Sequence, residues 1–319
     1  MRDEGDRTNR LSDPSVPIDV FQMPMALGAN CDGVDLGAAT LDDAMRRLLA
    51  SRGYQQIASR LRPSVEIPVA PLDPATEGRG DTPNAWYVNE IGDACGRLAE
   101  AVADSITAER FALMLGGDHA ASIGSLAGAG VAGRLGVIWI DAHADINTPE
   151  TSPSGNVHGM PLAVALGQGP ERLTAIGARS GLRIDDLVYI GLRDLDPAER
   201  DLLRTGPALV FTADAIEERG IDEAILTSID RLLRNGVDAV HLSIDIDSLD
   251  PSIVPGTGTR FPGGLTYREL IRAIGQLRRS NLPIASADVV ELNPLLDPTG
   301  GSTIVAAALA TALLGRTAL

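Results

Sequence analysis

The sequence predicts a single-domain α/β protein in which a mainly parallel β-sheet has helices on both faces, a three-layer α/β/α arrangement. From Trp86 onward, short apolar runs alternate with longer amphipathic segments, which is the pattern of successive β-α units. The chain has 319 residues, of which 44% are hydrophobic, and this length and composition suit one large domain.

Each expected strand is a short apolar run, and each expected helix is a longer amphipathic segment. The strands are expected at residues 111–115, 135–140, 187–192, 208–211, 239–244 and 284–290. The helices are expected at residues 86–105, 121–132, 197–204, 222–235, 266–279 and 303–314. Two of the helices have clear start signals, because Asp196 precedes Pro197 and because Thr266 and Glu269 form a capping box.

The N-terminal third of the chain shows little regular pattern. Residues 1–14 are polar and charged, which predicts a disordered tail ahead of a single domain over residues 15–319. Residues 62–83 are rich in Pro, Gly and Asp, which predicts a loop.

The charge balance excludes several functions. The chain has 43 acidic and 27 basic side chains, a formal net charge of -16, and every basic one is arginine. Without lysine, neither a Schiff-base mechanism nor a phosphate-binding G-K-[ST] loop is possible. No Arg-rich run provides the basic surface that nucleic acid or an anionic membrane requires, so a small cationic molecule is the more suitable partner.

The ends of the sequence and its cysteines favour a cytoplasmic protein. The apolar stretch 304–314 is shorter than the roughly 18 to 20 residues of a membrane span, and residues 1–15 lack the apolar core of a secretory signal. Cys31 and Cys95 are isolated in the sequence and are expected to be reduced, small apolar residues.

Polar side chains with catalytic potential directly follow the expected strands. They occupy residues 116–119 (Gly-Gly-Asp-His), 141–147 (Asp-Ala-His-Ala-Asp-Ile-Asn), 245–247 (Asp-Ile-Asp) and 291 (Glu). The carboxyl ends of parallel strands share one edge of the sheet, where open α/β folds bind ligands. These side chains are therefore expected to meet in one site.

The spacing within these segments predicts a dinuclear metal site. The two-residue period of a strand directs Asp141, His143 and Asp145 to one side, and it does the same for Asp245 and Asp247. Carboxylates this close repel one another, or remain protonated, unless cations neutralise them. An oxygen-rich donor set with a minority of imidazoles favours Mn²⁺ over Zn²⁺ or Mg²⁺, and two such ions can deprotonate a bridging water.

A simpler interpretation is that these acidic residues are only helix caps, since D-x-D arises by chance in an acidic chain. The combination of two acidic motifs with Gly-Gly-Asp-His119 is far more specific and favours the metal site. Of the remaining histidines, His158 lies in a polar loop, whereas His241 lies inside an expected strand and is interpreted as a hydrogen-bonded core residue.

Three segments together resemble the signature blocks of the ureohydrolase family, manganese enzymes that hydrolyse guanidino groups to urea. These segments are 116–119, 141–147 and 243–251 (Ser-Ile-Asp-Ile-Asp-Ser-Leu-Asp-Pro). The resemblance extends from about Phe111 to the C-terminus, and residues 28–37 are only loosely similar. Further segments resemble the arginase branch of the family, namely 154–161, 191–199, 256–259 and 263–269.

The resemblance implies which residues hold the two Mn²⁺ ions. One ion would be held by His119, Asp141, Asp145 and Asp245. The other would be held by Asp141, His143, Asp245 and Asp247. Asp141 and Asp245 would then bridge the pair.

The resemblance also implies the catalytic roles. Asp145 would hydrogen-bond a metal-bridging hydroxide and pass its proton to the leaving amine, His158 would shuttle protons to solvent, and Glu291 would pair with the guanidinium. These roles suit the reaction, because a guanidinium carbon is resonance-stabilised and resists attack by neutral water.

The implied reaction is hydrolysis of L-arginine to L-ornithine and urea. In arginase, the counterparts of Asn147, Ser154 and Asn156 bind the α-carboxylate, and those of Asp194, Asp196 and Glu199 lie near the α-amino group. Thr259, in the arginase-like segment 256–259, is expected to contact the substrate too. Agmatine lacks the carboxylate and would leave donors unpaired, at a cost of about 1 to 3 kcal/mol for each buried one. Turn and cap chemistry alone could also select these residue types.

Two departures from the family pattern and several alternatives remain. Ala120 stands where serine commonly follows Gly-Gly-Asp-His, and Arg260 and Phe261 replace a small apolar run. An Arg260 facing the pocket mouth would repel arginine or favour a longer, acidic guanidino compound. The alternatives are an agmatinase or guanidinobutyrase, a single-zinc deacetylase and a non-catalytic metal-binding protein. The deacetylase requires a His-His pair that this chain lacks.

The resemblance further implies a homotrimer or homohexamer.

Overall fold

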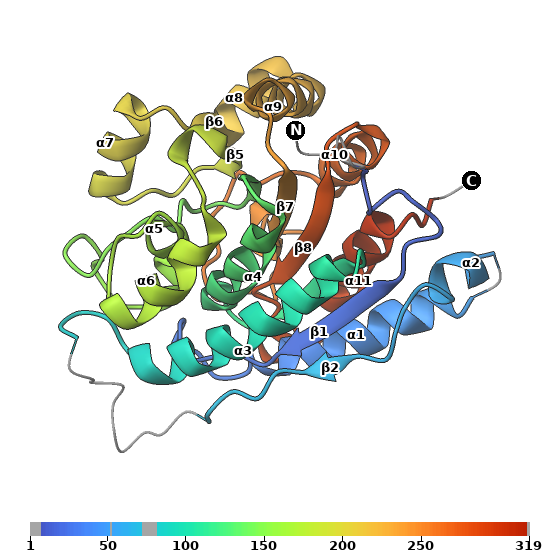
Figure 1. Cartoon of the computed structure of the whole chain (residues 1–319), viewed down its shortest axis with the longest axis horizontal. Coiled ribbons are helices and arrows are strands. Elements are labelled where there is room, and N and C mark those ends of the chain that lie inside the picture. The colour runs from blue at the N-terminus through green and yellow to red at the C-terminus, as the bar shows by residue number, and fades with distance from the viewer. Residues whose placement is uncertain (1–7, 52, 72–81, 318–319) are drawn as a thin grey trace.

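A computed structural model describes residues 8–51, 53–71 and 82–317 of the chain (Figure 1). In this part of the protein, eight parallel strands form one sheet in the order β2-β1-β3-β8-β7-β4-β5-β6. The strands are β1 (Ile18–Met23), β2 (Val65–Glu66), β3 (Phe111–Gly116), β4 (Leu135–Ile140), β5 (Leu187–Leu192), β6 (Leu209–Thr212), β7 (Ala239–Asp245) and β8 (Ile284–Val290).

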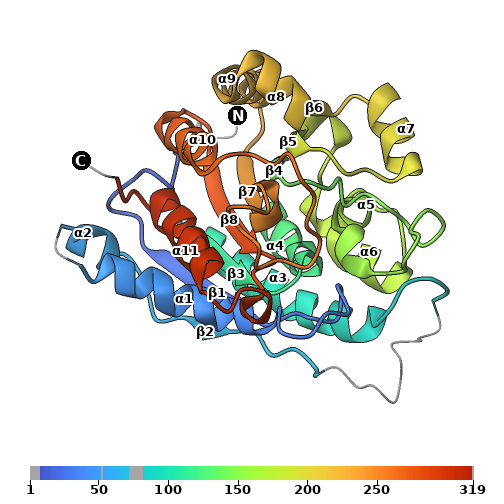
Figure 2. The ribbon, with the colours of Figure 1, turned by 180° about the vertical axis from the view of Figure 1, so that it is seen from behind.

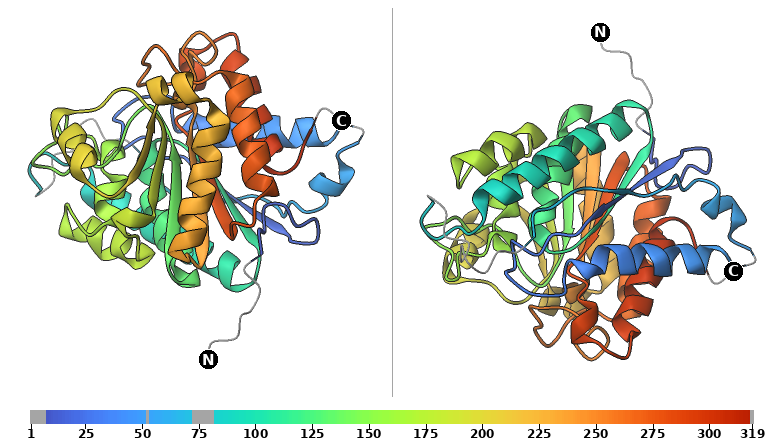
Figure 3. Two further views of the ribbon diagram at one scale, coloured as in Figure 1. Left: turned by 90° about the horizontal axis from the view of Figure 1, so that it is seen from above. Right: turned by 90° about the horizontal axis from the view of Figure 1, so that it is seen from below.

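Helices cover both faces of this sheet, as the two views of Figure 3 show. One apolar core lies between the sheet and α3 to α6, and a second lies between the sheet and α1 and α8 to α11 (Figure 2). The helices are α1 (Leu36–Leu49), α2 (Gln55–Ala58), α3 (Val88–Thr107), α4 (Ser122–Ala129), α5 (Pro161–Ala165), α6 (Glu171–Gly177), α7 (Pro197–Thr205), α8 (Ala213–Arg219), α9 (Ile221–Asn235), α10 (Tyr267–Arg279) and α11 (Gly301–Leu313).

The predicted fold class is confirmed, and the six expected strands are present within one residue of their expected bounds. The expected helices are present as α3, α4, α7, α9, α10 and α11, although α4 ends early and a short 3-10 helix (Gly130–Ala132) follows it. Both predicted helix starts form as expected. Asp196 with Glu199, and Thr266 with Glu269, make capping boxes at α7 and α10.

The N-terminal region is more regular than the sequence predicts. Residues 1–7 of the expected tail lie outside the described residues, but Leu11 is buried and the side-chain amide of Asn9 donates to the Leu277 carbonyl at 3.0 Å. The loop expected over 62–83 contains β2, and its residues 72–81 lie outside the described part. The strand β1 and the helix α1 were not anticipated.

The middle of the sheet is covered on both sides, which restricts where a ligand can bind. Every residue of β3, β4, β7 and β8 is buried, so polar groups are accessible only where these strands end. Among the helices of the described residues, none has the length and apolar character to cross a membrane.

Candidate metal centre and active site

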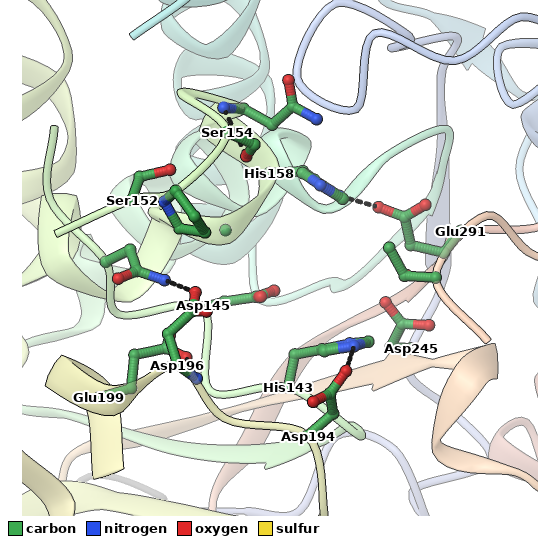
Figure 4. Close-up of a pocket in the computed structure, with 15 residues that line it drawn as sticks. His143, Asp145, Ser152, Ser154, His158, Asp194, Asp196, Glu199, Asp245 and Glu291 are labelled. Atoms are coloured by element: carbon green, nitrogen blue, oxygen red, sulfur yellow. Dashed lines mark hydrogen bonds and ion pairs between the residues drawn. The ribbon is translucent and has the colours of Figure 1, made fainter. Parts of the chain in front are cut away.

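The predicted site residues come together at the carboxyl edge of the sheet (Figure 4). Four neighbouring strands, β3, β8, β7 and β4, each end in one of the predicted segments. His119 follows β3, Glu291 follows β8, Asp245 ends β7, and Asp141 follows β4. Adjacency in the sheet therefore unites residues that are far apart in the sequence.

Two sets of ligand-type atoms lie at this edge. The Nδ1 atom of His119 is 3.1 Å from Asp141 Oδ2, 3.0 Å from Asp145 Oδ2 and 3.2 Å from Asp245 Oδ2. The first set, His119, Asp141 and Asp245, has donor atoms within 4.8 Å of one another, as does the second set, Asp141, His143 and Asp247. Asp141 belongs to both sets, which is the arrangement of a bridging ligand.

The second set is centred on His143. Its Nδ1 atom lies 3.1 Å from Asp247 Oδ2 and 3.4 Å from Asp141 Oδ1. Asp245 belongs to the first set alone, whereas the resemblance implied that it is a ligand of both ions.

The donor atoms at the centre fit a cation. Within the described residues, His119 Nδ1 and Asp141 Oδ2 are buried and have no hydrogen-bond partner. Ser243 Oγ lies 2.8 Å from His119 Nε2, and the ring stacks on Trp139 at 4.0 Å between centroids. With Nε2 donating to Ser243, Nδ1 keeps its lone pair facing the carboxylates, and a metal ion would satisfy both unpartnered atoms.

Without such ions, the buried carboxylates repel one another when they are ionised. Burial, together with the charge of Asp141, raises the pKa of Asp145 to about 6. Burial and the charges of Asp247 and Asp141 raise the pKa of Asp245 well above its usual value. Burial also opposes ionisation of Asp141, but His119 and His143 hold its pKa well below the usual range. Ionising all these groups together therefore requires added positive charge.

Two site residues have a left-handed backbone that is uncommon outside glycine. Asp145 has a φ of 50° and Glu291 a φ of 67°. Such conformations cost roughly 1 to 3 kcal/mol and occur preferentially where function requires a particular side-chain direction. Both residues direct their carboxylates into the same pocket.

Glu291 and His158 form a hydrogen-bonded pair beside the metal ligands. Glu291 Oε1 accepts a hydrogen bond from the His119 amide at 2.9 Å and lies 3.0 Å from His158 Nδ1. Burial opposes the charged form of His158, but the contact with Glu291 outweighs it and raises the pKa of His158 to about 9.

A pocket of about 140 Å³ opens above the ligand sets. All the residues predicted to act in catalysis or to bind substrate line it, and so do three of the predicted metal ligands, His143, Asp145 and Asp245. The lining comprises His143, Asp145, Asn147, Ser152, Pro153, Ser154, Asn156, His158, Gly159, Asp194, Asp196, Glu199, Asp245, Thr259 and Glu291. The ligands His119, Asp141 and Asp247 are buried beneath this lining.

Other polar residues of the pocket form hydrogen bonds with neighbouring side chains and backbone groups. Asn147 Nδ2 donates to Asp196 Oδ2 at 2.8 Å, and Asn156 Nδ2 donates to the Ala29 carbonyl at 3.2 Å. Glu199 is buried and accepts a hydrogen bond from the Ile146 amide at 3.1 Å. The predicted cap roles and a role in the pocket therefore coexist.

The other predicted substrate-binding residues also contact neighbouring groups of the protein. The side chain of Asp194 is 48% exposed at the rim, and its Oδ2 atom lies 3.7 Å from His143 Nε2. The hydroxyl of Ser154 accepts a hydrogen bond from the Asn156 amide at 3.2 Å. The Thr259 hydroxyl donates to Asp247 Oδ2 at 2.9 Å, so Thr259 contacts a predicted metal ligand as well as lining the pocket.

Some residues at the site had no individual role assigned from the sequence. Ser152, Pro153 and Gly159 also line the pocket. Ser243 orients His119, and its place two residues before Asp245 on β7 was the signal that could have revealed it. Neither Arg260 nor Phe261 is among the described residues that line the pocket.

His241 is a core residue, as predicted. It is fully buried, with Nδ1 2.8 Å from Ser286 Oγ and Nε2 3.0 Å from Asp288 Oδ2.

Cys31 and Cys95 are both free, and Cys95 is buried.

Comparison with known proteins agrees with this geometry. The model of the arginase family matches residues 16–315. The chain belongs to the arginase family.

Individual members of the family resemble the chain over nearly its whole length. The arginase of Bacillus caldovelox is 40% identical over 302 residues, which cover 94% of this chain and 98% of that protein. The solved structure of an arginase from the same organism superposes with a TM-score of 0.85 at 38% identity, covering 95% of this chain and all of that one. The Entamoeba histolytica arginase solved in complex with L-ornithine has a TM-score of 0.82 at 30% identity, covering 94% and 99% of the two chains.

Proposed function

We propose that the protein hydrolyses L-arginine to L-ornithine and urea and that it requires two manganese ions. The observation that carries this proposal is the pocket itself. One end is built from the two ligand sets, and the other from amide, hydroxyl and carboxylate groups suited to an α-amino acid. The full-length similarity to proteins named arginase, one of them solved with L-ornithine, supports the same assignment.

We infer that the two sets each hold one ion, with Asp145 added to the first and Asp245 shared by both. One ion would be held by His119, Asp141, Asp145 and Asp245, and the other by Asp141, His143, Asp245 and Asp247. When bound, the two ions would supply a hydroxide from water near neutral pH. The donor set, with more carboxylates than imidazoles and no thiolate, suits manganese.

The protein's own residues would bind and orient the guanidinium. Glu291 Oε1 is already occupied by the His119 amide and His158, which leaves Oε2 to accept hydrogen bonds from the substrate. This carboxylate would hold the plane of the guanidinium above the ligand sets, so that its carbon faces the attacking oxygen. The left-handed backbone of Glu291 fixes the direction from which it does so.

Proton transfer would fall to Asp145 and His158. Asp145 Oδ2, 3.0 Å from His119 Nδ1, would take the proton of the attacking water and pass it to the departing amine as the carbon–nitrogen bond breaks. His158, partly exposed at the pocket wall, would exchange protons with solvent. The products are then a neutral urea and the amine of ornithine in its protonated form.

The far end of the pocket would select arginine over agmatine. Asn147, Ser154 and Asn156 would bind the α-carboxylate, directly or through water, and Asp194, Asp196 and Glu199 would lie near the α-amino group. Thr259 would act through Asp247. Agmatine would leave the carboxylate donors unpaired, which costs about 1 to 3 kcal/mol for each buried one.

Steady-state kinetics on matched guanidino compounds test the proposal. Urea release should be fastest from L-arginine, should fall at least tenfold in kcat/KM for agmatine and 4-guanidinobutyrate, and should require added manganese. Preference for agmatine would transfer the assignment to an agmatinase. Absence of urea from every compound, with metal bound, would defeat the hydrolase proposal.

We also propose that the active form is a homotrimer or homohexamer, which rests on the family resemblance. Ile304 on α11 is 66% exposed, an apolar contact available to a neighbouring copy. Light scattering of the manganese-loaded protein should give three or six times the chain mass of 33.4 kDa, and a monomeric mass would contradict this proposal.

A further inference from the structure

Arg193 has a side chain whose hydrogen bonds go entirely to backbone oxygens around the site. It follows β5 directly and is partly buried. Its Nη2 atom donates to the carbonyls of Asp247 at 2.6 Å and Phe261 at 2.8 Å, and its Nε atom also donates to Phe261 at 3.2 Å. Longer hydrogen bonds reach the carbonyls of Ser248 and Leu249, both at 3.3 Å.

These carbonyls belong to two segments that serve the site in different ways. Asp247 is a member of the second ligand set. Phe261 lies two residues after Thr259, whose hydroxyl donates to Asp247 Oδ2 at 2.9 Å. Arg193 therefore joins a metal ligand to the loop that supports the same ligand from the other side.

The backbone of Arg193 is tied to the other ligands of that set. The amides of Arg193 and Asp194 donate to the carbonyl of Ala142, at 2.9 and 3.1 Å, between Asp141 and His143. In the second ligand set, the Asp247 carbonyl accepts a hydrogen bond from the Arg193 side chain. Asp141 and His143 flank Ala142, whose carbonyl accepts hydrogen bonds from the amides of residues 193 and 194. Of the first set, Asp141 is shared and so lies beside Ala142, and Asp245 lies two residues before Asp247, whereas His119 has no such connection to Arg193 in the described contacts.

Only arginine can make this arrangement. Its planar guanidinium presents five N–H donors in a fixed fork, so a single side chain can span two loops. Lysine keeps the charge but provides three donors around one point, and it cannot reach the carbonyls of both segments together. Burial lowers the pKa of Arg193. The negative charges of the nearby aspartates act in the opposite direction, so the guanidinium interacts electrostatically with the site.

We propose that Arg193 is a positioning residue that sets the geometry of the second ligand set, Asp141, His143 and Asp247, and of the adjoining loop at 259–261. This inference rests on the proposed function, because it concerns the same metal site. Arg193 does not touch the substrate pocket itself and acts through the backbone of Asp247 and Phe261.

The test is a manganese titration of the metal-free protein, its Arg193→Lys and Arg193→Met variants, and matched controls. The control is Arg231, which also donates to two loop carbonyls, those of Asp185 and Pro207, but lies outside the pocket. Arg193→Lys should weaken one of the two manganese sites about 10- to 100-fold, the usual effect of losing an outer partner of a metal ligand. The other site, which shares Asp141, should weaken less, and both sites of Arg231→Lys should remain within about threefold of the parent.

Kinetics and thermal unfolding complete the test. With saturating manganese, Arg193→Lys should lose about tenfold in kcat, with a smaller change in KM. Equal manganese affinities in Arg193→Lys and the parent would overturn the inference. So would equal weakening of both sites together with a loss of thermal stability beyond that of Arg231→Lys, because that result indicates general support of the fold.

The design separates this inference from the proposed function. If Arg193→Met does not fold, Arg193→Lys still decides, because it retains the charge and most of the apolar stem. Manganese affinity is measured without substrate, so a parent protein that binds two ions but releases no urea defeats only the proposed activity.

Discussion

At the scale of single residues, burial and proximity determine the chemistry of the site. Asp145 has a raised pKa, near 6, because it is buried beside Asp141. It also lies within hydrogen-bonding distance of a metal-ligand histidine, on a backbone conformation that favours few residue types. In the metal-free fold this carboxyl group exchanges its proton close to neutral pH, and bound cations would hold it ionised and able to accept one.

Replacing Asp145 with Asn tests this role. The amide keeps the shape of the side chain but cannot take a proton, so urea release at pH 8 should fall by about 10² to 10⁴-fold. Asp230→Asn removes an exposed carboxylate on α9 and should leave the rate unchanged. Circular dichroism should show both variants folded, and an undiminished rate for Asp145→Asn would contradict its place in the mechanism.

At the scale of elements, the strand ends were predictable and the contacts between loops were not. Apolar runs such as 135–140 and 187–192 are buried on both sides, so their hydrophobicity alone marks them as strands. Strand β1 is interrupted by Asp19, which is paired with Arg62 and Arg110, and the sequence conceals it for that reason. Arg193 meets its partners across 54 to 68 residues, a separation that no local pattern reports.

The glycine-rich segment after β3 shows how closely the elements approach. A Cβ atom on Gly117 would lie 1.9 Å from the carbonyl oxygen of Met25, which is backbone and cannot yield easily. The same segment carries Asp118, whose carboxylate accepts hydrogen bonds from the amides of Gly28 and Ala29 at 2.8 and 2.9 Å. His119 therefore owes its position to a contact with the N-terminal region that local sequence does not reveal.

Gly117→Ala should destabilise the protein by about 2 kcal/mol or more, because the added methyl group forces two backbones apart. The matched control is Gly96→Ala within α3, where the nearest atom is Ile176 Cδ1 at 3.9 Å. That change should stabilise the protein by up to about 1 kcal/mol through helix propensity. Chemical denaturation measures both, and equal effects of the two substitutions would refute the close approach at Gly117.

At the scale of the whole molecule, one parallel sheet gathers the site and concentrates negative charge there. Neighbouring strands β3, β8, β7 and β4 deliver their acidic ends to one edge. The sequence predicted this convergence because parallel strands share direction, and the segments were specific enough to indicate metal. It could not predict which carboxylates share a proton or an ion, since this depends on distances set by the fold.

The metal-free protein should lose stability as the pH rises from 6 to 8.5. The pKa values of Asp145, Asp245 and Glu199 are raised in the fold, Glu199 to about 7, mainly by burial. The folded protein thus binds more protons than the unfolded chain in this range, and stability falls with increasing pH. Burial opposes the charged forms of His119 and His158, but the neighbouring carboxylates outweigh it and raise both pKa values, which acts in the same direction.

Thermal unfolding after chelation, compared at pH 6 and 8.5, measures this effect. Added manganese should raise the unfolding temperature most at the higher pH, where the carboxylates are ionised. A metal-free protein that is more stable at pH 8.5 than at pH 6 would show that ionising the buried acidic groups does not destabilise the fold.

The central claim is that these carboxylates and imidazoles are arranged around two cations. Anomalous diffraction at the manganese absorption edge, from crystals grown with manganese, tests it most directly. We expect two peaks, one bound by Nδ1 of His119 and the other by Nδ1 of His143, with Asp141 contacting both. A single peak, or none with the aspartates turned toward solvent, would contradict the claim.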